Sequence, residues 1–326
     1  MSDLAKEMSV VNAGSSVSVE NMAHWNDFYN EVPAPLNYAE VISGVRKFIQ
    51  DAKQECARVA VVTSGGTMVP LEQLTVRFVD NFSSGTRGAA STEYFLDEGY
   101  KVVFLNRQKS IQPYARHIPS VLDVLELDRE TNVKVKSCHA SKIQSVLESY
   151  EKYKSSCFAI TYESLGDYLW LLKGISTELN SIGASGMLYL AAAVSDFYIP
   201  KNDMPEHKIQ SDRRPEITFS LVPKMLRPLV KEWAPEAYII SFKLETDPNI
   251  LLQKAEKALK LYQHNMVIAN MLTTRKKTVT AVERTGEVVK IDNHDEDKEI
   301  ESLIVNLVKE KHSKYIQELS AKSPFP

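Results

Sequence analysis

The sequence predicts an α/β protein with a Rossmann-like, three-layer and mostly parallel sheet, interrupted by a largely helical insertion. Three observations predict this class. Short apolar segments recur along the chain, as expected of buried parallel strands. Segments with helical periodicity alternate with them, which is the rhythm of βαβ units. Glycine-rich loops follow the first apolar segment and precede the next helix, where sheets of this class bind their ligands.

The first βαβ unit begins near residue 58 and is preceded by a helix. Residues 37–57 are predicted to form that helix, because Val41, Val45, Phe48 and Ile49 share one face. The run RVAVVTS at 58–64 predicts a buried strand that ends at a Gly-Gly pair. The loop NFSSGTRG at 81–88 then leads into a helix through Leu96, and YKVVFLN at 100–106 predicts the second strand.

The middle of the chain has a different pattern. Residues 108–185 are rich in charged residues and helix formers, so we predict a largely helical insertion with one strand, CFAITY. Beyond it we predict strands at 187–197, 216–222, 237–245 and 265–272, helices at 224–233, 250–262 and 298–319, and a β-hairpin joined across Arg284-Thr285. We expect a single domain over residues 1–326, with residues 1–20 loosely ordered.

Composition excludes several classes of protein. The net charge of −3 and a pI of about 6.2 provide no basic surface for nucleic acid. The three cysteines are widely spaced and form no zinc-binding pattern, so structural zinc is not expected; reduced thiols favour a cytoplasmic location. No apolar run reaches the roughly 18 residues that a membrane span needs. The sequence does not identify metal ligands.

Two loops predict an anion-binding site. TSGGT at 63–67 lies at the carboxyl end of the first strand, where glycines let a phosphate approach the backbone. SSGTRG leads into a helix near Gly88, where free N–H groups and the helix dipole favour an anion. Either loop alone is also consistent with an ordinary turn. Two loops around one connection, with the hydroxyls of Ser83, Ser84 and Thr86, favour a phosphate site, although neither matches GxGxxG or GxxxxGK[ST].

Several ordered motifs resemble a known family. The stretch TSGGTMVPLEQLTVRFVDNFSSGTRGAASTEYFLDEGY at 63–100 is similar to the first signature of phosphopantothenate–cysteine ligases, in their eukaryotic, monofunctional form. AAAVSDFYIP, MPEHKIQS, VPKMLRPLVKEWAPEAYIISFKLETD and NMVIANML also match, so the resemblance covers about residues 25–285 and is weaker in the insertion. It implies a ligase that joins 4′-phosphopantothenate to L-cysteine through an acyl-nucleotidylate, with release of pyrophosphate, in coenzyme A synthesis. It also implies ATP, with CTP as the alternative nucleotide, together with Mg²⁺ and a homodimer.

The resemblance also implies roles for individual residues. Asn81 would contact phosphopantothenate, and Arg77 would reach that substrate from the neighbouring subunit. Lys208 lies where bacterial members have a lysine-rich KxKK loop, and the sequence HKIQS lacks two of those lysines. The nucleotide would contact Gly65, Ser83, Gly85, Gly88, Phe242 and Asn270. Phosphopantothenate would also contact Ala192, Ala193 and Asp196.

The chemistry of acyl activation requires similar residue types. A carboxylate and an α-phosphate are both anions, so their approach needs N–H donors, magnesium and a cation, for which Arg77, Lys208 and Lys243 are candidates. Amide formation then passes through an oxyanion, and Asn81 is a neutral donor suited to it. Each residue also has a structural interpretation: Asn81 in an Asx-turn, Asp196 as a cap, Phe242 in the core.

Two rival functions remain open at this point. YEKYK at 150–154 fits the YxxxK pattern of NAD(P)-dependent short-chain dehydrogenases, although it lies in a charged amphipathic segment and the nicotinamide glycine fingerprint is missing. A non-catalytic nucleotide-binding regulator on the same fold is the other alternative. Pyrophosphate release from ATP that depends on phosphopantothenate would distinguish all three.

Overall fold

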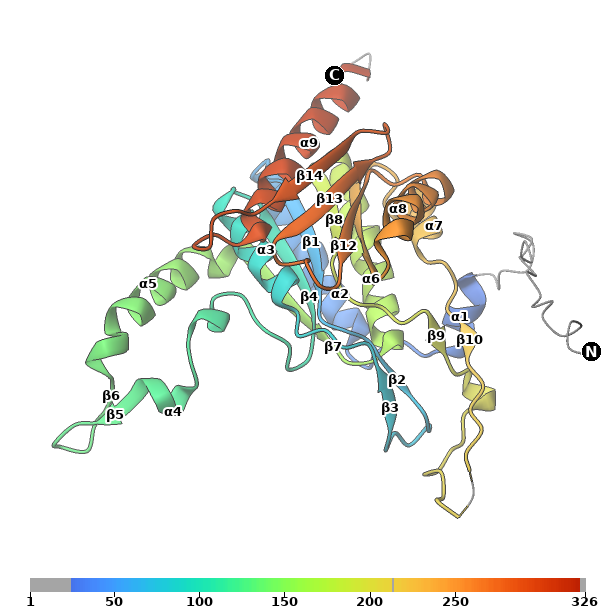
Figure 1. Ribbon diagram of the computed structural model, residues 1–326, viewed down its shortest axis with the longest axis horizontal. Coiled ribbons are helices and arrows are strands. Elements are labelled where there is room, and N and C mark those ends of the chain that lie inside the picture. The colour runs from blue at the N-terminus through green and yellow to red at the C-terminus, as the bar shows by residue number, and fades with distance from the viewer. Residues whose placement is uncertain (1–24, 213, 323–326) are drawn as a thin grey trace, which may run out of the picture.

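The computed structural model describes residues 25–212 and 214–322, and its centre is an eight-stranded sheet (Figure 1). The strand order is β14-β13-β12-β11-β8-β1-β4-β7. The strands are β1 (Val59–Ser64), β4 (Lys101–Arg107), β7 (Cys157–Tyr162), β8 (Gly186–Leu190), β11 (Tyr238–Glu245), β12 (Met266–Met271), β13 (Thr278–Glu283) and β14 (Val288–Asp292). All neighbours from β7 to β12 pair in parallel, and β13 and β14 add an antiparallel edge. The predicted Rossmann-like class is confirmed.

The strand order places the ligand crevice. Numbered along the chain, the six parallel strands run 3-2-1-4-5-6, the doubly wound order. The direction of winding reverses between β1 and β8, which are neighbours in the sheet. Ligands of such sheets bind outside the carboxyl ends of the strands at this switch point. The TSGGT loop follows β1 directly, so it lies at the predicted position.

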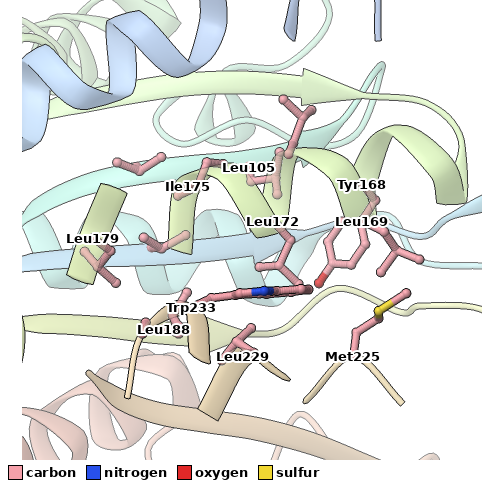
Figure 2. Packing of buried hydrophobic residues seen from close by; sticks show 14 of the residues in the cluster. Leu105, Tyr168, Leu169, Leu172, Ile175, Leu179, Leu188, Met225, Leu229 and Trp233 are labelled. Carbon is pink, nitrogen blue, oxygen red and sulfur yellow. The ribbon is translucent and has the colours of Figure 1, made fainter. Parts of the chain in front are cut away.

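Helices cover both faces of the sheet because its strands alternate their side chains. Val59 and Val61 of β1 pack into one hydrophobic cluster, and Ala60 and Val62 into another. Figure 2 shows part of the first cluster, in which Ile175 lies among other buried apolar side chains. The first face carries α1 (Trp25–Glu31), α2 (Tyr38–Gln54), α6 (Leu165–Leu179), α7 (Leu226–Pro228) with the π-turn Leu229–Trp233, and α8 (Pro248–Tyr262); the second carries α3 (Thr86–Asp97) and α9 (Ile300–Lys322).

The insertion is narrower than the predicted range 108–185. The segment CFAITY is β7, the edge strand of the main sheet, and α6 packs on that sheet, so residues 157–179 belong to the Rossmann-like layers. The part that projects from the body in Figure 1 contains α4 (Val121–Val124), the β5–β6 ribbon (Leu125–Leu127, Val133–Val135) and α5 (Ser137–Tyr153). As an edge strand of the sheet, β7 is only partly buried, whereas β1 is buried along its whole length.

Other boundaries also differ from the prediction. Of the strand predicted at 216–222, only Ser220–Leu221 (β10) is paired, and its partner is Phe197–Tyr198 (β9) rather than the main sheet. Its alternating apolar side chains are exposed, since no layer covers them. A further hairpin, β2 (Met68–Pro70) with β3 (Phe78–Asp80), was not predicted. The hairpin across Arg284-Thr285 and the last helix are confirmed. Residues 1–20 lie outside the described part of the chain, and the single-domain assignment remains a prediction.

Candidate functional site

The segments that follow β1 and β8 meet at the switch point. Gly65 has a φ of +88°, which turns the chain at the end of β1. The Gly65 carbonyl accepts a hydrogen bond from the Ala193 N–H at 2.8 Å, and the Thr67 N–H donates to the Ala193 carbonyl at 3.0 Å. The Ala192 N–H donates to the Thr63 Oγ1 atom at 3.1 Å. The structure therefore brings Gly65, Ala192 and Ala193 together, although the sequence placed them in separate motifs.

The N-terminus of α3 lies directly over the end of β1. Gly85 caps this helix with a φ of +82°, and its carbonyl accepts a hydrogen bond from the Ser64 hydroxyl at 2.9 Å. Gly88 permits the close approach, since a Cβ atom there would lie 2.4 Å from the Cβ and Oγ atoms of Ser64. Among the residues that the structure describes, no side chain caps this helix, and the first turn of the helix contains no acidic residue. The free N–H groups of this turn can therefore receive an anion at the carboxyl edge of the sheet.

The hydroxyl groups of the loop line the approach to this helix end. Ser83 Oγ accepts a long hydrogen bond, 3.4 Å, from the Gly85 N–H. The Ser84 and Thr86 hydroxyls lie 3.0 Å apart and are exposed. These weak or solvent-facing contacts are readily exchanged for phosphate oxygens.

Asn81 lies beside the glycine turn. The Asn81 N–H donates to the Thr67 carbonyl at 3.1 Å, and a Cβ atom on Gly66 would come within 1.7 Å of the Asn81 carbonyl oxygen. In the described part of the chain, Asn81 is half-buried and forms its hydrogen bond through the backbone rather than the side chain, so it does not close the Asx-turn that the sequence allowed. Its amide is therefore available next to the segment that contains Ala192 and Ala193.

Asp196 lies at the outer edge of the same segment. Its carboxylate is 72% exposed and lies 3.7 Å from the Lys224 ammonium. Ser195, rather than Asp196, caps the local turn, because the Ser195 hydroxyl accepts from the Phe197 N–H at 3.2 Å. Asp196 is thus free to contact a ligand from solvent.

Phe242 and Asn270 lie on β11 and β12, on the sheet face that α3 covers. The Phe242 ring packs edge-on against Tyr189 with 4.9 Å between centroids. The Arg87 guanidinium lies 5.7 Å from the Phe242 ring centroid, pairs with Glu301 at 3.2 Å and donates to the Arg275 carbonyl at 2.6 Å. Sequence reasoning assigned no role to Arg87, although it lies within the loop NFSSGTRG. Its position two residues after Gly85, in the first turn of the predicted helix, was the available signal.

Asn270 has a buried acceptor without a partner. Its Nδ2 group donates to the carbonyls of Ile268 and Lys243 at 3.0 and 3.5 Å. Both neighbours are acceptors, which fixes the orientation of the amide. Within the described residues no donor reaches Oδ1, although Asn270 is only 4% exposed. A buried acceptor of this kind can receive a hydrogen bond from a ligand group or from an ordered water.

Arg77 and Lys208 lie away from the glycine loops. Arg77 precedes β3 and Asn81 follows it, so an extended backbone separates the two by about 13 Å at roughly 3.3 Å per residue. The Arg77 Nη1 group donates to Glu72 at 3.1 Å and to the Ile209 carbonyl at 3.0 Å. Lys208 is exposed and, within the described residues, forms no ion pair. The same chain therefore does not bring these two cations to its own α3 N-terminus.

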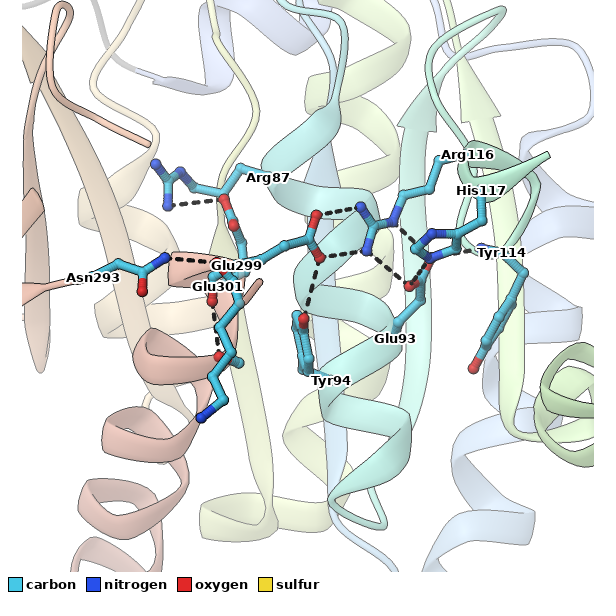
Figure 3. Close-up of polar contacts among 11 residues, drawn as sticks. Arg87, Glu93, Tyr94, Tyr114, Arg116, His117, Asn293, Glu299 and Glu301 are labelled. Carbon is cyan, nitrogen blue, oxygen red and sulfur yellow. Dashed lines mark hydrogen bonds and ion pairs between the residues drawn. The ribbon is translucent and has the colours of Figure 1, made fainter. Parts of the chain in front are cut away.

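A network of charged residues fixes α3 against the body of the protein (Figure 3). The Arg116 guanidinium donates to Glu93 of α3 at 2.9 Å and to Glu299, just before α9, at 2.6 Å. Burial lowers the pKa of Arg116, but the hydrogen bonds to Glu299 and Glu93 outweigh it and raise that pKa above its usual range. Tyr94 also donates to Glu299 at 3.2 Å. These contacts hold α3, and with it the anion-binding end, in one orientation.

The described residues contain no group of three or more His, Cys, Asp or Glu side chains that could hold a metal ion. Among the helices in the described ranges, none is long and apolar enough to cross a membrane.

The YxxxK pair, Tyr150 and Lys154, lies at the end of the projecting helix α5.

The doubly wound sheet and the glycine turns at its switch point define an α/β protein of the class that binds ligands at the carboxyl edge of its sheet. Residues 176–318 match the family model described as the DNA/pantothenate metabolism flavoprotein C-terminal domain. The chain belongs to the phosphopantothenate–cysteine ligase family. It is 43% identical to the human phosphopantothenate–cysteine ligase over 307 residues, covering 88% of this chain and 96% of that protein. It is 49% identical over 261 residues to ligase 1 of Oryza sativa subsp. japonica, covering 78% and 81%.

A solved structure supports the same family. A single-site variant of Cab2 in complex with phosphopantothenate-cysteine superimposes with a TM-score of 0.83 at 39% identity, covering 90% of this chain and 99% of that chain. The predicted family resemblance is confirmed. A short-chain dehydrogenase, the rival based on Tyr150 and Lys154, has no support from these relatives.

Proposed function

We propose that the protein is a ligase that joins 4′-phosphopantothenate to L-cysteine in coenzyme A synthesis. A nucleoside triphosphate activates the pantothenate carboxylate as an acyl-nucleotidylate and pyrophosphate leaves; the cysteine amine then displaces the nucleotide. The observation that carries this proposal is the meeting of Gly65, Gly85 and Gly88 around Ser64, with Asn81 beside them. Family membership supports the same activity.

The nucleotide phosphates would lie at the N-terminus of α3. The N–H groups there, the turn at Gly65 and the Ser83 hydroxyl supply donors without a fixed positive charge. Mg²⁺ would neutralise the phosphate charge, held chiefly by phosphate oxygens and water, as is usual for this ion. Phe242 would contact the nucleotide from the sheet face beneath α3.

Asn270 supports a nucleobase that carries an exocyclic amine. Its unpaired, buried Oδ1 atom requires a donor, and adenine and cytosine both present an amino group. We therefore propose ATP as the nucleotide, with CTP as the alternative. ITP tests this directly, because hypoxanthine has a carbonyl where adenine has the amine. ATP should be preferred over ITP by roughly tenfold or more, since an unpaired buried group costs about 1–3 kcal/mol. Asn270→Leu should abolish that preference, and an unchanged ratio in the variant would remove Asn270 from base recognition.

Phosphopantothenate would occupy the segment after β8. The N–H and carbonyl of Ala193 and the N–H of Ala192 are already paired within the protein, so these residues would contact the substrate through their methyl groups and the Ala192 carbonyl. The exposed Asp196 carboxylate would accept from a substrate hydroxyl or amide. The Asn81 amide would donate to the oxygen that gains charge when cysteine attacks.

A homodimer would explain the positions of Arg77 and Lys208. Both lie on projecting loops and do not approach the glycine turns of their own chain. Exposed apolar side chains occur on the same projections and suit a subunit contact: Leu74, Val76, Phe78, Phe197, Phe219 and Leu221. We propose that Arg77 reaches phosphopantothenate of the partner subunit and that Lys208 neutralises charge during activation. The reduced cysteines are consistent with a cytoplasmic location.

Pyrophosphate release from ATP tests the proposed function. The release must depend on phosphopantothenate, and the amide must form only when cysteine is also present. Asn81→Asp keeps the size of the side chain but removes the donor, so amide formation should fall about 10²–10³-fold. The acyl-adenylate should then accumulate in rapid-quench experiments with radiolabelled ATP. Asn306→Asp, on the exposed face of α9, is the matched control. Equal loss of both half-reactions would mean that Asn81 positions the carboxylate instead, and no pyrophosphate release by the wild-type protein would refute the ligase activity.

A further inference from the structure

A buried carboxylate lies between the two projecting loops that carry Arg77 and Lys208. Glu72 follows β2, and its side chain is 0% exposed. A carboxylate is almost never buried this completely without partners that compensate for its lost hydration. Sequence reasoning gave Glu72 no role, and none of the steps described above uses it.

The partners of Glu72 come from both loops. On the first loop, the N–H groups of Val76 and Arg77 donate to Oε2 at 3.3 and 3.0 Å, and the Arg77 guanidinium donates to Oε1 at 3.1 Å. On the second loop, the N–H of Ile209, the residue after Lys208, donates to Oε1 at 3.4 Å. Four donors from segments more than 130 residues apart in sequence thus converge on one carboxylate.

Main-chain contacts align the two loops around it. The Gln73 N–H donates to the Pro205 carbonyl at 2.9 Å, and the Leu74 N–H donates to the Glu206 carbonyl at 3.0 Å. The Arg77 guanidinium completes the connection by donating to the Ile209 carbonyl at 3.0 Å. Burial raises the pKa of Glu72, but the hydrogen bonds from Arg77, Ile209 and Val76 outweigh it and hold that pKa below its usual range. The carboxylate is therefore ionised when it joins the loops.

We propose that Glu72 is a positioning residue that holds the Arg77 loop and the Lys208 loop as one cationic unit for the phosphopantothenate half of the reaction. Lys208 has no side-chain partner of its own within the described residues, so its place is set by the backbone on either side of it. The hydrogen bond from the Ile209 N–H to the Glu72 carboxylate anchors the backbone next to Lys208. This inference rests on the proposed function, because it assigns Arg77 and Lys208 to that reaction.

Glu72→Gln tests the inference, since it keeps the size of the side chain but replaces one acceptor oxygen with a donor facing other donors. We expect kcat/KM for phosphopantothenate to fall about 10–100-fold, the scale of a displacement near 1 Å. KM for the nucleotide should remain unchanged, because β3 separates the two loops from the glycine turns that would hold the nucleotide phosphates. Glu72→Asp, which retains the charge, should recover part of the activity and remains informative if Glu72→Gln folds poorly. Glu206→Gln, an exposed acid on the same loop, is the matched control.

A double-mutant cycle with Lys208→Gln separates positioning from a merely structural role. Glu72 and Lys208 side chains make no direct contact, so coupling between them must pass through the loop. Glu72 also holds Arg77, so part of its effect remains when Lys208 is absent. If the rest of its effect passes through Lys208, the double variant should lose less than the product of the two single losses. Additive losses, or equal increases in both KM values, would overturn the proposal. Full activity of Lys208→Gln would also overturn it, while leaving the ligase activity intact.

Limited trypsin digestion gives a readout that does not depend on activity. Release of the second loop in Glu72→Gln should accelerate cleavage after Lys208, detected by mass spectrometry, relative to Glu206→Gln. Unchanged cleavage would show that Glu72 does not hold the loops together. If the wild-type protein lacked phosphopantothenate-dependent pyrophosphate release, the proposed function would fail, and digestion would still decide whether the two loops are coupled.

Discussion

Substituting Gly66 by alanine should disable the site while the protein remains folded. A Cβ atom at this position would lie 1.7 Å from the Asn81 carbonyl oxygen and 2.9 Å from the Asn81 carbonyl carbon. Contacts of Cβ atoms below 3.0 Å are essentially never seen, so the two segments would have to separate by more than about 1 Å. The obstructing atoms belong to the backbone, and rotation of a side chain therefore cannot relieve the clash.

The required movement acts on the catalytic geometry. Gly66 pairs with Ala193, and the Asn81 N–H is bonded to the Thr67 carbonyl. Separating these segments moves the Asn81 amide relative to the segment that would hold phosphopantothenate. A misplacement near 1 Å costs roughly 10²-fold in rate, whereas accommodating one extra methyl costs about 1–3 kcal/mol of stability. Gly66→Ala should therefore lose about 10²-fold in kcat/KM and remain folded at 25 °C.

Gly99→Ala is the control for backbone effects. Gly99 follows Glu98, the C-cap of α3, with a φ of +79°, and a Cβ atom there would have no neighbour within 4 Å among the described residues. That variant should lose about 1–2 kcal/mol through left-handed strain and keep its catalytic rate. The assay is amide formation with both substrates saturating and then limiting, alongside urea unfolding. Activity of Gly66→Ala within twofold of wild type would refute the close approach of Gly66 to Asn81.

Three further changes test the fold. Ile175→Ala, in the buried cluster of Figure 2, should lower the free energy of unfolding in urea by about 2–5 kcal/mol, whereas Thr177→Ala on the exposed face of α6 should change it by less than about 0.5 kcal/mol. Arg116→Met removes the guanidinium from the buried Glu93, which within the described residues keeps only the Tyr114 N–H and the His117 ring nitrogen as partners. The change should cost roughly 3 kcal/mol, near the lower end for a broken buried pair, because these contacts remain and Glu299 is 37% exposed. A neutral result would show that the network of Figure 3 does not stabilise α3. Burial lowers the pKa of His312 to about 4 from 6.5, so the unfolded chain takes up the proton first as pH falls. The contribution of His312 to the free energy of unfolding is full above pH 6.5 and declines toward pH 4, by up to about 1.4 kcal/mol per pH unit. His312→Gln should make this decline less steep when urea midpoints are measured against pH. An unchanged slope would contradict the assignment of the decline to His312.

The sequence predicted the sheet because its central strands are buried on both faces. Such strands contain an uninterrupted apolar stretch, as VAVV at 59–62, VVFL at 102–105 and MVIA at 266–269 show. The glycine turns were predictable for a related reason: Gly65 and Gly85 take left-handed conformations that other residues rarely adopt. Chemistry that depends on backbone conformation therefore leaves a local sequence signal.

The features that sequence reasoning missed depend on contacts between distant segments. Glu72 reads as one more charged residue in a loop, and only its burial against Ile209 reveals a role. EITFSLV has the alternation of a strand, but no helix or sheet covers its apolar side chains, and only two of its residues pair. Hydrophobic periodicity predicts which face of a segment is apolar, but it does not predict whether another element packs on that face.

The position of the α3 N-terminus is set by β1 rather than by the loop that leads to it. The Ser64 hydroxyl donates to the Gly85 carbonyl at 2.9 Å, the Ser64 carbonyl accepts from the Tyr162 hydroxyl at 2.8 Å, and Gly88 packs against Ser64 directly. Since Ser64 is fully buried in the central strand of the parallel sheet, these contacts transmit the rigidity of the sheet to the end of the helix. The residues between Asn81 and Gly85 need not be packed themselves, and Phe82 is 92% exposed. The loop can therefore rearrange around a ligand while the N–H groups of α3 remain fixed, which is the preorganisation that binding of a developing anion requires.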